Sequence, residues 1–432
     1  MTCFGSSAMP DRHQHPWPEV CLREIGEISA GGTPSRDDPS LWNGTVPWLT
    51  PGDLTKNPRT ITTDGAEYIT KAGLNRSAAA LMPPGALLVT TRATLGARTI
   101  AGVPMATNQG FKNIVFNPAL ADSRFYFHLF GLLASELVRR ASGTTFLEIS
   151  GKEFGNIKVP RPPLFEQRKI AELLDVVDDK IQAVTLELSK LRLLRSGALR
   201  HAMSAGLGLI GSVEASRFRD IDGIAAHGWS AIRLGSLILQ IEAGNSPDLE
   251  DRPAANGEWG VLKVSSVGRD GFRPAENKVA LESALHHENL CVRAGDLIMT
   301  RANTADLVGL SCVVEETPSN LMLCDKTLRL VVDDRKTSAK FIDLVLETDE
   351  LRTQIQIAAT GTSASMKNIS QASIQSLVVP YSATEMERIC GLDAAHRKLI
   401  SVQQAELLKL RNLKQGIMVD LLTGRVRVRR DR

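Results

Sequence analysis

Apolar residues recur at alternating spacings of four and three positions through the segment that begins at Ile170. This spacing keeps apolar side chains on one face of a helix and is typical of the seam of a coiled coil. Three prolines at 160, 162 and 163 stop a helix from forming earlier, and Gly206 and Gly208 end it. We therefore predict a long helix from Leu164 to about residue 204. Its seam consists of Ile170, Leu174, Val177, Ile181, Val184, Leu188 and Leu191.

A second helix of similar length is predicted from Ala383 to about Leu422. A helix with sustained heptads needs a partner helix of similar length, and each of the two long helices finds one in the other. We therefore expect an antiparallel coiled coil; the alternative is that both helices are buried in a larger bundle. The second seam is predicted at Leu392, Ala395, Leu399 and Val402, followed by a slip of one residue before Leu407 and Leu410.

The rest of the chain carries shorter apolar runs between turn residues. Continuous apolar runs predict buried strands at 86–91, 113–116, 296–300 and 328–332. Longer helical stretches are predicted to follow at 121–141 and 338–358. The predicted fold class is α+β, with two mixed α/β globules separated by the two long helices.

The two halves of the chain also match each other in sequence. PGALLVTTRA at 84–93 returns as AGDLIMTRA at 294–302, and KLRLLRSGALRHAMSAG at 190–206 returns as KLRNLKQGIMVDLLTG at 409–424. Solenoid repeats are much shorter, at about 20–50 residues. Each copy is therefore a whole globule with its helix, and we expect a pseudo-two-fold axis to relate the copies.

These patterns predict the domain boundaries. A first globule spans 17–160 and is followed by a helix at 161–206 and a linker at 207–228. A second globule spans 229–380 and is followed by a helix at 381–424. An N-terminal extension at 1–16 and a basic tail at 425–432, expected to be frayed, complete the chain.

Composition narrows the class of protein without naming a ligand. The 432-residue chain has a formal net charge of +3, which allows local basic patches but does not demand nucleic acid. Its six cysteines lie far apart with no CxxC pair, as is typical of free thiols in a reducing compartment. We find neither a signal peptide nor an apolar run long enough to span a membrane. We expect a soluble cytoplasmic protein with no membrane partner.

The patterns that could carry catalysis do not fit their contexts. GLGLIG at 206–211 spells GxGxxG, but it follows a helix, whereas a dinucleotide fingerprint follows a strand. Pro247 and Asp248 with the Glu-Asn-Lys run at 276–278 have the form of a PD…ExK nuclease site, but Asp248 lies in an acidic, turn-rich loop. The eight histidines show no metal-ligand spacing. We expect a chain that is not an enzyme and binds neither metal nor cofactor.

Basic and amide side chains near the ends of the predicted strands have the chemistry needed to bind DNA. Arg and Lys reach phosphates or the O6/N7 edge of guanine, while Asn and Gln suit adenine. Asn108 and Gln109 beside Lys112 form the most suggestive cluster; the alternative for each residue is an ordinary solvated side chain. The candidate DNA-binding residues are Thr33, Ser35, Arg36, Arg92, Asn108, Gln109, Lys112, Arg301, Lys326 and Lys367.

Several of these segments together resemble one family, the specificity subunits of type I restriction-modification systems. The resemblance rests on GGTPSRDDPSLWNGTVPWLTPGDL at 31–54, LMPPGALLVTTRATLG at 81–96, TNQGFKNI at 107–114 and VPRPPLFEQRKIAELLDVVDDKI at 159–181. It covers nearly the whole chain from residue 17 to about residue 424. The second copy departs from the pattern where PPLFEQ is replaced by PYSATEME at 380–387.

The resemblance implies a function for each part of the chain. The globules would be target-recognition domains, each reading one half of a split, asymmetric site on double-stranded DNA. The two helices would set the spacing and dock two methyltransferase subunits, and restriction subunits would join for cleavage. S-adenosylmethionine, ATP and Mg²⁺ would then belong to the partner subunits and not to this chain.

The 31–54 segment is too rich in Gly and Pro for a helix and too rich in large aromatics for a flexible linker. We predict that Trp42 and Trp48 anchor it on the core and leave Thr33, Ser35 and Arg36 free to approach DNA. The second copy has EAGNSPDLEDR at 242–252 instead, so the two globules should read different half-sites.

Two other functions stay open at the level of sequence. One is a self-sufficient restriction enzyme or methyltransferase with a duplicated DNA-recognition region. The other is a scaffold protein that uses its coiled coil and binds other proteins through its globules.

Overall fold

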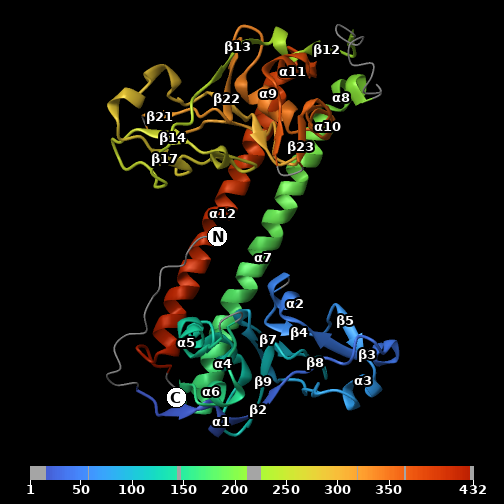
Figure 1. Ribbon diagram of the computed structural model, residues 1–432, viewed down its shortest axis with the longest axis vertical. Helices are drawn as coiled ribbons and strands as arrows, with labels where there is room; N and C mark the ends of the chain where they lie inside the picture. The colour runs from blue at the N-terminus through green and yellow to red at the C-terminus, as the bar shows by residue number, and fades with distance from the viewer. Residues whose placement is uncertain are drawn as a thin grey trace. The chain divides into compact units, whose positions relative to one another are not determined.

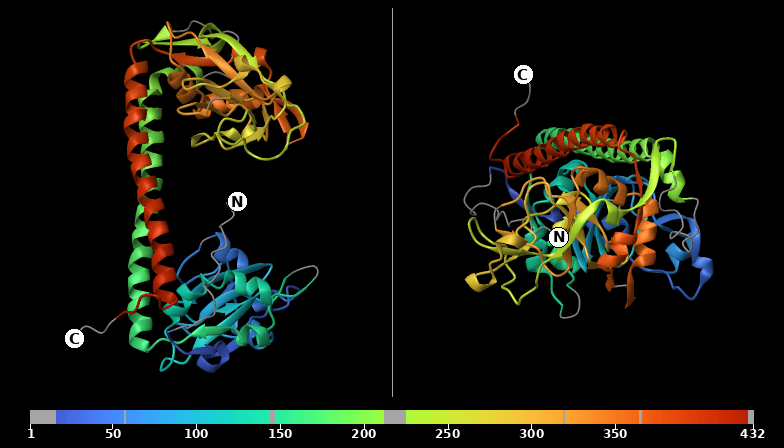
Figure 2. Two further views of the ribbon diagram at one scale, coloured as in Figure 1. Left: turned by 90° about the vertical axis from the view of Figure 1, so that its left-hand side faces the viewer. Right: turned by 90° about the horizontal axis from the view of Figure 1, so that it is seen from above.

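The computed structural model describes residues 16–56, 58–143, 147–211, 225–318, 320–363 and 366–428. Nearly all of the predicted N-terminal extension, most of the predicted linker at 207–228, and the last four residues of the basic tail lie outside these ranges. The chain divides into two compact units: unit 1 comprises residues 1–187 and 403–432, and unit 2 comprises residues 188–402. Figure 1 labels the elements of each unit, and Figure 2 shows them from two further directions.

Unit 1 is built on a five-stranded sheet in the order β2-β9-β6-β7-β4. Its central strands contain the apolar runs predicted to be buried: β6 is Leu87–Arg92 and β9 is Phe111–Phe116. A second sheet has the order β5-β3-β8, and β1 pairs with β10. The other strands are β1 Glu19–Cys21, β2 Gly26–Ala30, β3 Trp42–Leu49, β4 Ile61–Thr62, β5 Glu67–Ile69, β7 Thr94–Ala101, β8 Ala106–Thr107 and β10 Lys158–Pro160.

The helical region predicted at 121–141 is two helices, α4 (Ser123–Leu129) and α5 (Ala134–Arg140). Asp122 caps α4 by accepting hydrogen bonds from the next turn, and its position fixes where the helix begins. Four aromatic side chains of this region, at 125, 126, 127 and 130, are buried against the strands. The remaining short helices are α1 Leu22–Ile25, α2 Pro51–Lys56, α3 Lys71–Asn75 and α6 Gly151–Gly155.

Unit 2 contains a four-stranded sheet in the order β13-β22-β18-β20 and a three-stranded sheet in the order β17-β14-β21. The predicted strands at 296–300 and 328–332 are β18 (Leu297–Thr300) and β22 (Thr327–Val332). The other strands are β11 Ala225–Ala226, β12 Trp229–Arg233, β13 Ile238–Ala243, β14 Gly260–Leu262, β15 Val267–Gly268, β16 Gly271–Phe272, β17 Asn277–Val279, β19 Ala302–Asn303, β20 Ser311–Val313, β21 Leu321–Met322, β23 Thr360–Ser363, β24 Met366–Asn368 and β25 Val378–Tyr381.

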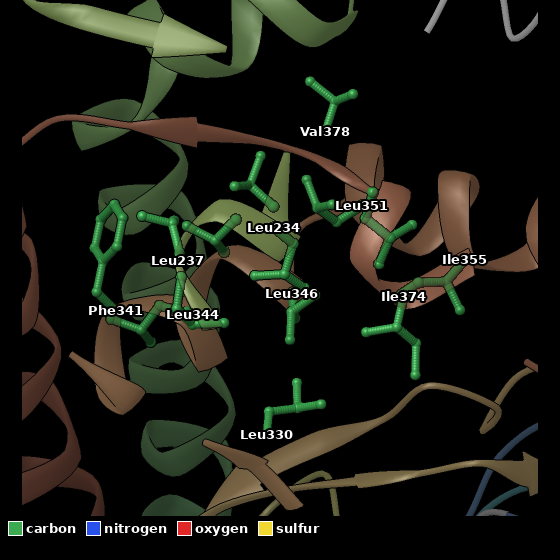
Figure 3. Close-up of a cluster of buried hydrophobic side chains, with 14 of the residues drawn as sticks. Leu234, Leu237, Leu330, Phe341, Leu344, Leu346, Leu351, Ile355, Ile374 and Val378 are labelled. Atoms are coloured by element: carbon green, nitrogen blue, oxygen red, sulfur yellow. The ribbon is translucent and has the colours of Figure 1, made fainter. Parts of the chain in front are cut away.

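The core of unit 2 lies between its main sheet and its helices. Here too the predicted helical region, 338–358, is two helices, α9 (Ala339–Leu346) and α10 (Asp349–Ala358), while α11 is Gln371–Ser376. Figure 3 shows Phe341 and Leu344 of α9 beside Leu330 of β22 in this core. Burial of such apolar side chains is the main force that holds the helices on the sheet.

The two units share one strand order. In unit 1 the sheet order β2-β9-β6-β7 matches β13-β22-β18-β20 of unit 2. In the smaller sheets β3 pairs antiparallel with β5 and parallel with β8, just as β14 pairs antiparallel with β17 and parallel with β21. The matching segments at 84–93 and 294–302 therefore also occupy matching places in the two sheets, on β6 and β18.

The long helices are α7 (Leu164–Ala202) and α12 (Met386–Leu422), each contributing one part to each unit. Within unit 1, α7 carries the buried residues Ile170, Leu174 and Val184, with Val177 and Ile181 half-buried between them. Within unit 2, Leu188 is buried and Leu191 is half-buried. All seven positions of the first predicted seam are thus turned away from solvent.

The seam predicted for the second helix is wrong at three positions: Ala395 is exposed, and the side chains of Leu399 and Val402 are 54% and 57% exposed. The residues turned inward keep an unbroken alternation of three and four positions, so no slip occurs. Several of them are polar, and this is why hydrophobicity alone misses them. The inward positions are Ile389, Asp393, His396, Ile400, Gln403, Leu407, Leu410, Lys414, Ile417 and Leu421.

Gly206 and Gly208 do not end the helical region as predicted, because both lie inside a further helix, α8 (Ser204–Gly211). A side chain at position 206 could not be accommodated: a Cβ there would lie 2.4 Å from the ring of Trp229. The glycine therefore permits close packing of α8 on β12. The GxGxxG segment belongs to this helix and not to a strand-to-helix turn.

The start of α7 explains the Glu-Gln pair of the PPLFEQ motif. Gln167 is fully buried and donates to the carbonyl oxygens of Leu120 and Pro162 at 3.0 and 2.8 Å. Glu166 accepts two hydrogen bonds from Arg427, at 2.9 and 2.6 Å. The described part of the basic tail is therefore tied to unit 1, and the prediction that this part is frayed is wrong.

Among the helices that the structure describes, none is long and apolar enough to cross a membrane.

Candidate nucleic-acid interface

Three loops of unit 1 leave its main sheet at the same end. Strand β2 ends at Ala30, which pairs with Lys112 at the start of β9, and Lys112 pairs in turn with Val89 in β6. Because neighbouring strands are antiparallel, the loop after β2, the β6–β7 connection and the loop before β9 all meet here. These loops and the adjoining ends of β6 and β9 carry all seven unit 1 residues proposed from sequence: Thr33, Ser35, Arg36, Arg92, Asn108, Gln109 and Lys112.

Two tryptophans anchor the loop after β2, as the sequence predicts. The indole nitrogen of the buried Trp48 donates to the carbonyl oxygen of Gly32 at 2.9 Å. The indole nitrogen of Trp42 donates to the carbonyl oxygen of Ser35 at 2.8 Å. The two rings meet edge to face with their centroids 5.1 Å apart. The loop is thereby held in one conformation at the end of the sheet.

Arg36 is exposed but not free, contrary to the prediction. Its guanidinium forms a two-fold ion pair with Glu67, at 2.5 and 2.8 Å, and stacks 3.8 Å above the centre of the Trp42 ring. The hydrogen bond with Glu67 raises the pKa of Arg36, and the same bond lowers the pKa of Glu67. Arg36 therefore presents a fixed, permanently charged plane at this surface.

The loop before β9 is fixed by its own hydrogen bonds. The Asn108 side-chain oxygen accepts from the backbone N–H of Gly110 at 2.9 Å, and Thr33 bonds the Gln109 side-chain oxygen at 2.5 Å. The Gln109 side chain is exposed, whereas Lys112 is only 6% exposed and lies 3.7 Å from Glu148. Glu148 lies at the same distance from Arg92. Lys112 is thus a partly neutralised, buried cation, and Gln109 is the more accessible group.

In unit 2 the corresponding loops also meet at one end of the main sheet. Ala243, the last residue of β13, pairs with Leu328 of β22, and Leu328 pairs with Met299 of β18. Arg301 follows β18 directly, and its backbone N–H donates to the carbonyl oxygen of Lys326 at 2.8 Å. Lys326 is exposed just before β22. The predicted residues Arg301 and Lys326 therefore lie together at this end.

Lys367 reaches the same region through β24, where it pairs with Asn303 of β19. Its ammonium group donates to the carbonyl oxygen of Gly361 at 2.7 Å. The Arg301 Nε atom is buried and has no hydrogen-bond partner within the described residues. Together the three cations give this surface of unit 2 a positive character.

Sequence reasoning missed the acidic and hydroxyl residues of these surfaces. Glu67 and Glu148 hold the cations of unit 1, and in unit 2 Ser246 bonds to Asp325. The internal repeat was the signal that could have found Asp325, because it stands where Gln109 stands in the first copy. Exposed carboxylates are easily taken for ordinary surface charge, so composition alone does not distinguish them.

Side chains considered for a nuclease site form contacts with other residues. Within the described ranges, no group of three or more His, Cys, Asp or Glu side chains is placed to hold a metal ion. Of the suggested nuclease residues, Glu276 accepts a hydrogen bond from Ser265 at 2.6 Å and Lys278 lies 3.8 Å from Asp251. The side chains at both sheet ends offer cationic donors for phosphates and amide or carboxylate groups for base edges.

A family model and two relatives match parts of this chain. Residues 14–191 match the family model described as the type I restriction modification DNA specificity domain. The chain is 31% identical over 241 residues to the type I restriction enzyme MjaIX specificity subunit of Methanocaldococcus jannaschii, covering 54% of each protein. It is 34% identical over 190 residues to the EcoEI specificity subunit of Escherichia coli, covering 42% of this chain and 32% of that protein. The matched region thus spans about half or less of each of these two relatives.

Among solved structures, the S subunit of a type I restriction-modification system from M. genitalium shares the fold, with a TM-score of 0.55 and 12% identity over 95% of this chain and 97% of that one. A mixed α/β architecture with long helices is thus common to both. The matching specificity domain and these relatives thus make the chain similar to type I restriction-modification specificity subunits.

Proposed function

We propose that this chain is the DNA-recognition subunit of a type I restriction-modification complex and that each unit reads one half of a bipartite, asymmetric site on double-stranded DNA. The observation that carries the proposal is the pair of equivalent sheet ends. Each brings together cations and hydrogen-bonding side chains from loops far apart in sequence. Because the two ends differ in loop sequence and charge, they suit different half-sites.

We further propose that the two units are copies of one fold related by a pseudo-two-fold axis. In this proposal the target-recognition domains span 17–160 and 229–380. The shared strand order of the main and smaller sheets supports this. The loops that follow β2 and β13 are the parts that differ most, and loops on a shared framework are where binding specificity ordinarily resides.

The long helices are proposed to pair antiparallel as a coiled coil. In unit 1, Lys414 of α12 forms an ion pair with Asp178 of α7 at 2.5 Å, and Glu406 lies 3.4 Å from Lys180. In unit 2, Arg195 of α7 contacts Asp393 of α12. The residue numbers run in opposite directions along the two helices, which supports antiparallel pairing with charged residues at some seam positions.

Exposed apolar side chains on these helices are the proposed docking surface for two methyltransferase subunits. Single exposed apolar residues are common, but so many on two helices favour a protein partner. They are Leu173, Val176, Leu186, Leu408 and Leu413 in unit 1, and Leu193, Leu194, Leu399 and Val402 in unit 2. Restriction subunits would complete the complex for cleavage.

Catalysis is assigned to the partner subunits, which would bind S-adenosylmethionine, ATP and Mg²⁺. This chain contributes recognition and geometry. It would work in the cytoplasm, where its DNA and partners are found.

The test is the methylation of an oligonucleotide library by the full chain with its methyltransferase subunits. The library randomises two half-sites and varies the gap between them. Inserting one heptad in each helix, after Val184 and after Gln403, adds about 10.5 Å to each. The preferred gap should lengthen by about three base pairs, at about 3.4 Å per pair, with the same bases read. A changed gap accompanied by changed bases would contradict the division of roles.

Docking is tested separately with charges on the exposed helix face. Leu193→Asp and Leu194→Asp should weaken capture of the methyltransferase subunits without lowering the melting temperature of the chain. Leu281→Asp, at a leucine that is 63% exposed and belongs to neither long helix, is the matched control. Equal capture by the helix variants and the control would exclude this surface.

A further inference from the structure

The two sheet ends correspond residue by residue. Ala30 pairs with Lys112 in unit 1, and Ala243 pairs with Leu328 in unit 2. Three residues beyond each alanine stands a hydroxyl side chain, Thr33 or Ser246. Three residues before each partner stands a polar acceptor, Gln109 or Asp325. The pairing of the strands therefore makes Gln109 and Asp325 equivalent positions.

A glycine contact fixes these positions in both units. A Cβ on Gly31 would lie 2.0 Å from the carbonyl oxygen of Asn108, and a Cβ on Gly244 would lie 1.8 Å from that of Leu323. Only glycine allows the two backbones to approach so closely. The contact holds the loop after the edge strand against the loop before the neighbouring strand, next to Gln109 in one unit and two residues before Asp325 in the other.

The same hydrogen bond then links the two loops in each unit. Thr33 Oγ1 bonds to Gln109 Oε1 at 2.5 Å, and Ser246 Oγ donates to Asp325 Oδ1. The backbone N–H of Asp325 also donates to Ser246 Oγ at 3.4 Å. All four side chains are nevertheless exposed. Each acceptor is therefore held in position while its other hydrogen-bonding capacity faces solvent.

The chemistry of the two acceptors differs. An amide such as that of Gln109 both donates and accepts and matches the N7 and N6 groups of adenine. An ionised carboxylate such as that of Asp325 only accepts and matches the N4 amino group of cytosine. A carboxylate would also repel phosphate, so its presence among Arg301, Lys326 and Lys367 favours contact with a base edge and not with the backbone.

We propose that Gln109 and Asp325 are equivalent base-reading residues, Gln109 selecting adenine in one half-site and Asp325 selecting cytosine in the other. The hydroxyls of Thr33 and Ser246 act as positioning groups that hold the acceptors. This inference rests on the proposed function, because it assigns individual bases to the two units.

The experiment replaces the carboxylate at position 325 with an amide and the amide at position 109 with a carboxylate. The full chain with its methyltransferase subunits selects sites from an oligonucleotide library that randomises both half-sites. Asp325→Gln should change one cytosine to adenine in one half-site, with a change in preference of about ten-fold or more, as expected for a good side-chain-to-base pair. Gln109→Glu should change one adenine to cytosine in the other half-site. The gap between half-sites should stay unchanged in both variants.

Asp334→Asn is the matched control, because Asp334 is also exposed and acidic but lies beyond the opposite end of β22. It should select the same sites as the unaltered chain. Because all the altered side chains are exposed, melting temperatures should agree, and this is checked for each variant.

The outcomes distinguish a failure of this inference from a failure of the proposed function. If the unaltered chain selects a bipartite site but Asp325→Gln selects the same bases, or alters both halves, the base-reading inference is wrong and the proposed function stands. If the unaltered chain selects no bipartite site at all, the proposed function itself is wrong, and this inference is overturned with it.

Discussion

Arg195 of α7 and Asp393 of α12 form an ion pair in unit 2, with the Arg195 Nε atom 2.6 Å from Asp393 Oδ1, although the Asp393 side chain is completely buried. Lys340 and Arg397 also contact Asp393, at 3.1 and 2.8 Å. Burial alone would raise the pKa of Asp393, but the positive charges of Arg397, Lys340 and Arg195 hold it below its ordinary value. A charged cluster therefore joins α9 of the globule to both long helices.

Replacing Asp393 should destabilise unit 2 strongly. Asp393→Ala removes the buried carboxylate that the three cations share and leaves Glu347 as the remaining partner of Arg195 and Arg397. Breaking a buried ion pair costs up to about 3–5 kcal/mol. Chemical denaturation of the full chain measures the loss. The control is Glu406→Ala, which breaks the exposed pair with Lys180 and should cost less than about 1 kcal/mol. Equal losses for both variants would contradict the structural role of the buried cluster.

The stability of unit 2 should also depend on pH through Asp343. Burial, with a smaller contribution from the charge of Glu347, raises the pKa of Asp343 to about 6. In the unfolded chain the carboxyl has its ordinary pKa of 3.8, so between these values the folded state binds more protons than the unfolded state. The contribution of this group to the free energy of unfolding therefore falls as pH rises from about 4 to about 6.

The variant Asp343→Asn isolates this contribution. It keeps an acceptor for the Ser311 hydroxyl, which bonds Asp343 Oδ1 at 2.9 Å, but it cannot ionise. Between pH 4 and pH 7.5 the variant should gain stability relative to the unaltered chain, by on the order of 2 kcal/mol. Denaturation at several pH values measures the difference. A constant difference across this range would show that Asp343 does not titrate there.

Two adjacent leucines of α12 test the corrected seam in unit 1. Leu407 is 7% exposed and Leu408 is 60% exposed. Leu407→Ala should cost about 2 kcal/mol or more, because it removes buried methyl groups and leaves a gap. Leu408→Ala should stay within about 0.5 kcal/mol, as surface substitutions do. Melting of the two variants side by side gives the comparison, and the reverse order would place the seam elsewhere.

Arg36 and Glu67 test the proposed interface of unit 1. Arg36→Gln should weaken binding to DNA of any sequence. It should also make the plot of log affinity against log salt concentration shallower by about 0.9, the value for one lost phosphate contact. Glu67→Gln should strengthen binding, because it removes a negative charge from the surface that faces the phosphates. An unchanged salt dependence in Arg36→Gln would mean that Arg36 does not contact phosphate.

The sequence alone predicted those elements that depend on residues close to one another in the chain. The apolar runs of β6, β9, β18 and β22 are buried strands because nearly every side chain in them must leave water, and this is visible in a short window. The seam of α7 was predictable for the same reason, since its seven positions are all apolar. The anchoring role of the two tryptophans in the loop after β2 was also predictable, because large aromatic side chains in a segment rich in Gly and Pro are expected to pack on the core.

Contacts between distant segments decided the rest. Asp393 and Lys414 look like surface residues in sequence, and only the arrival of Arg195 and Asp178 from α7 makes them inward positions of α12. For the same reason the sequence does not reveal that Arg36 forms an ion pair with Glu67. The equivalence of Gln109 and Asp325 depends on which residues the strands pair. A charged or polar side chain is stable either in water or beside a partner, and the partner is a property of the tertiary structure.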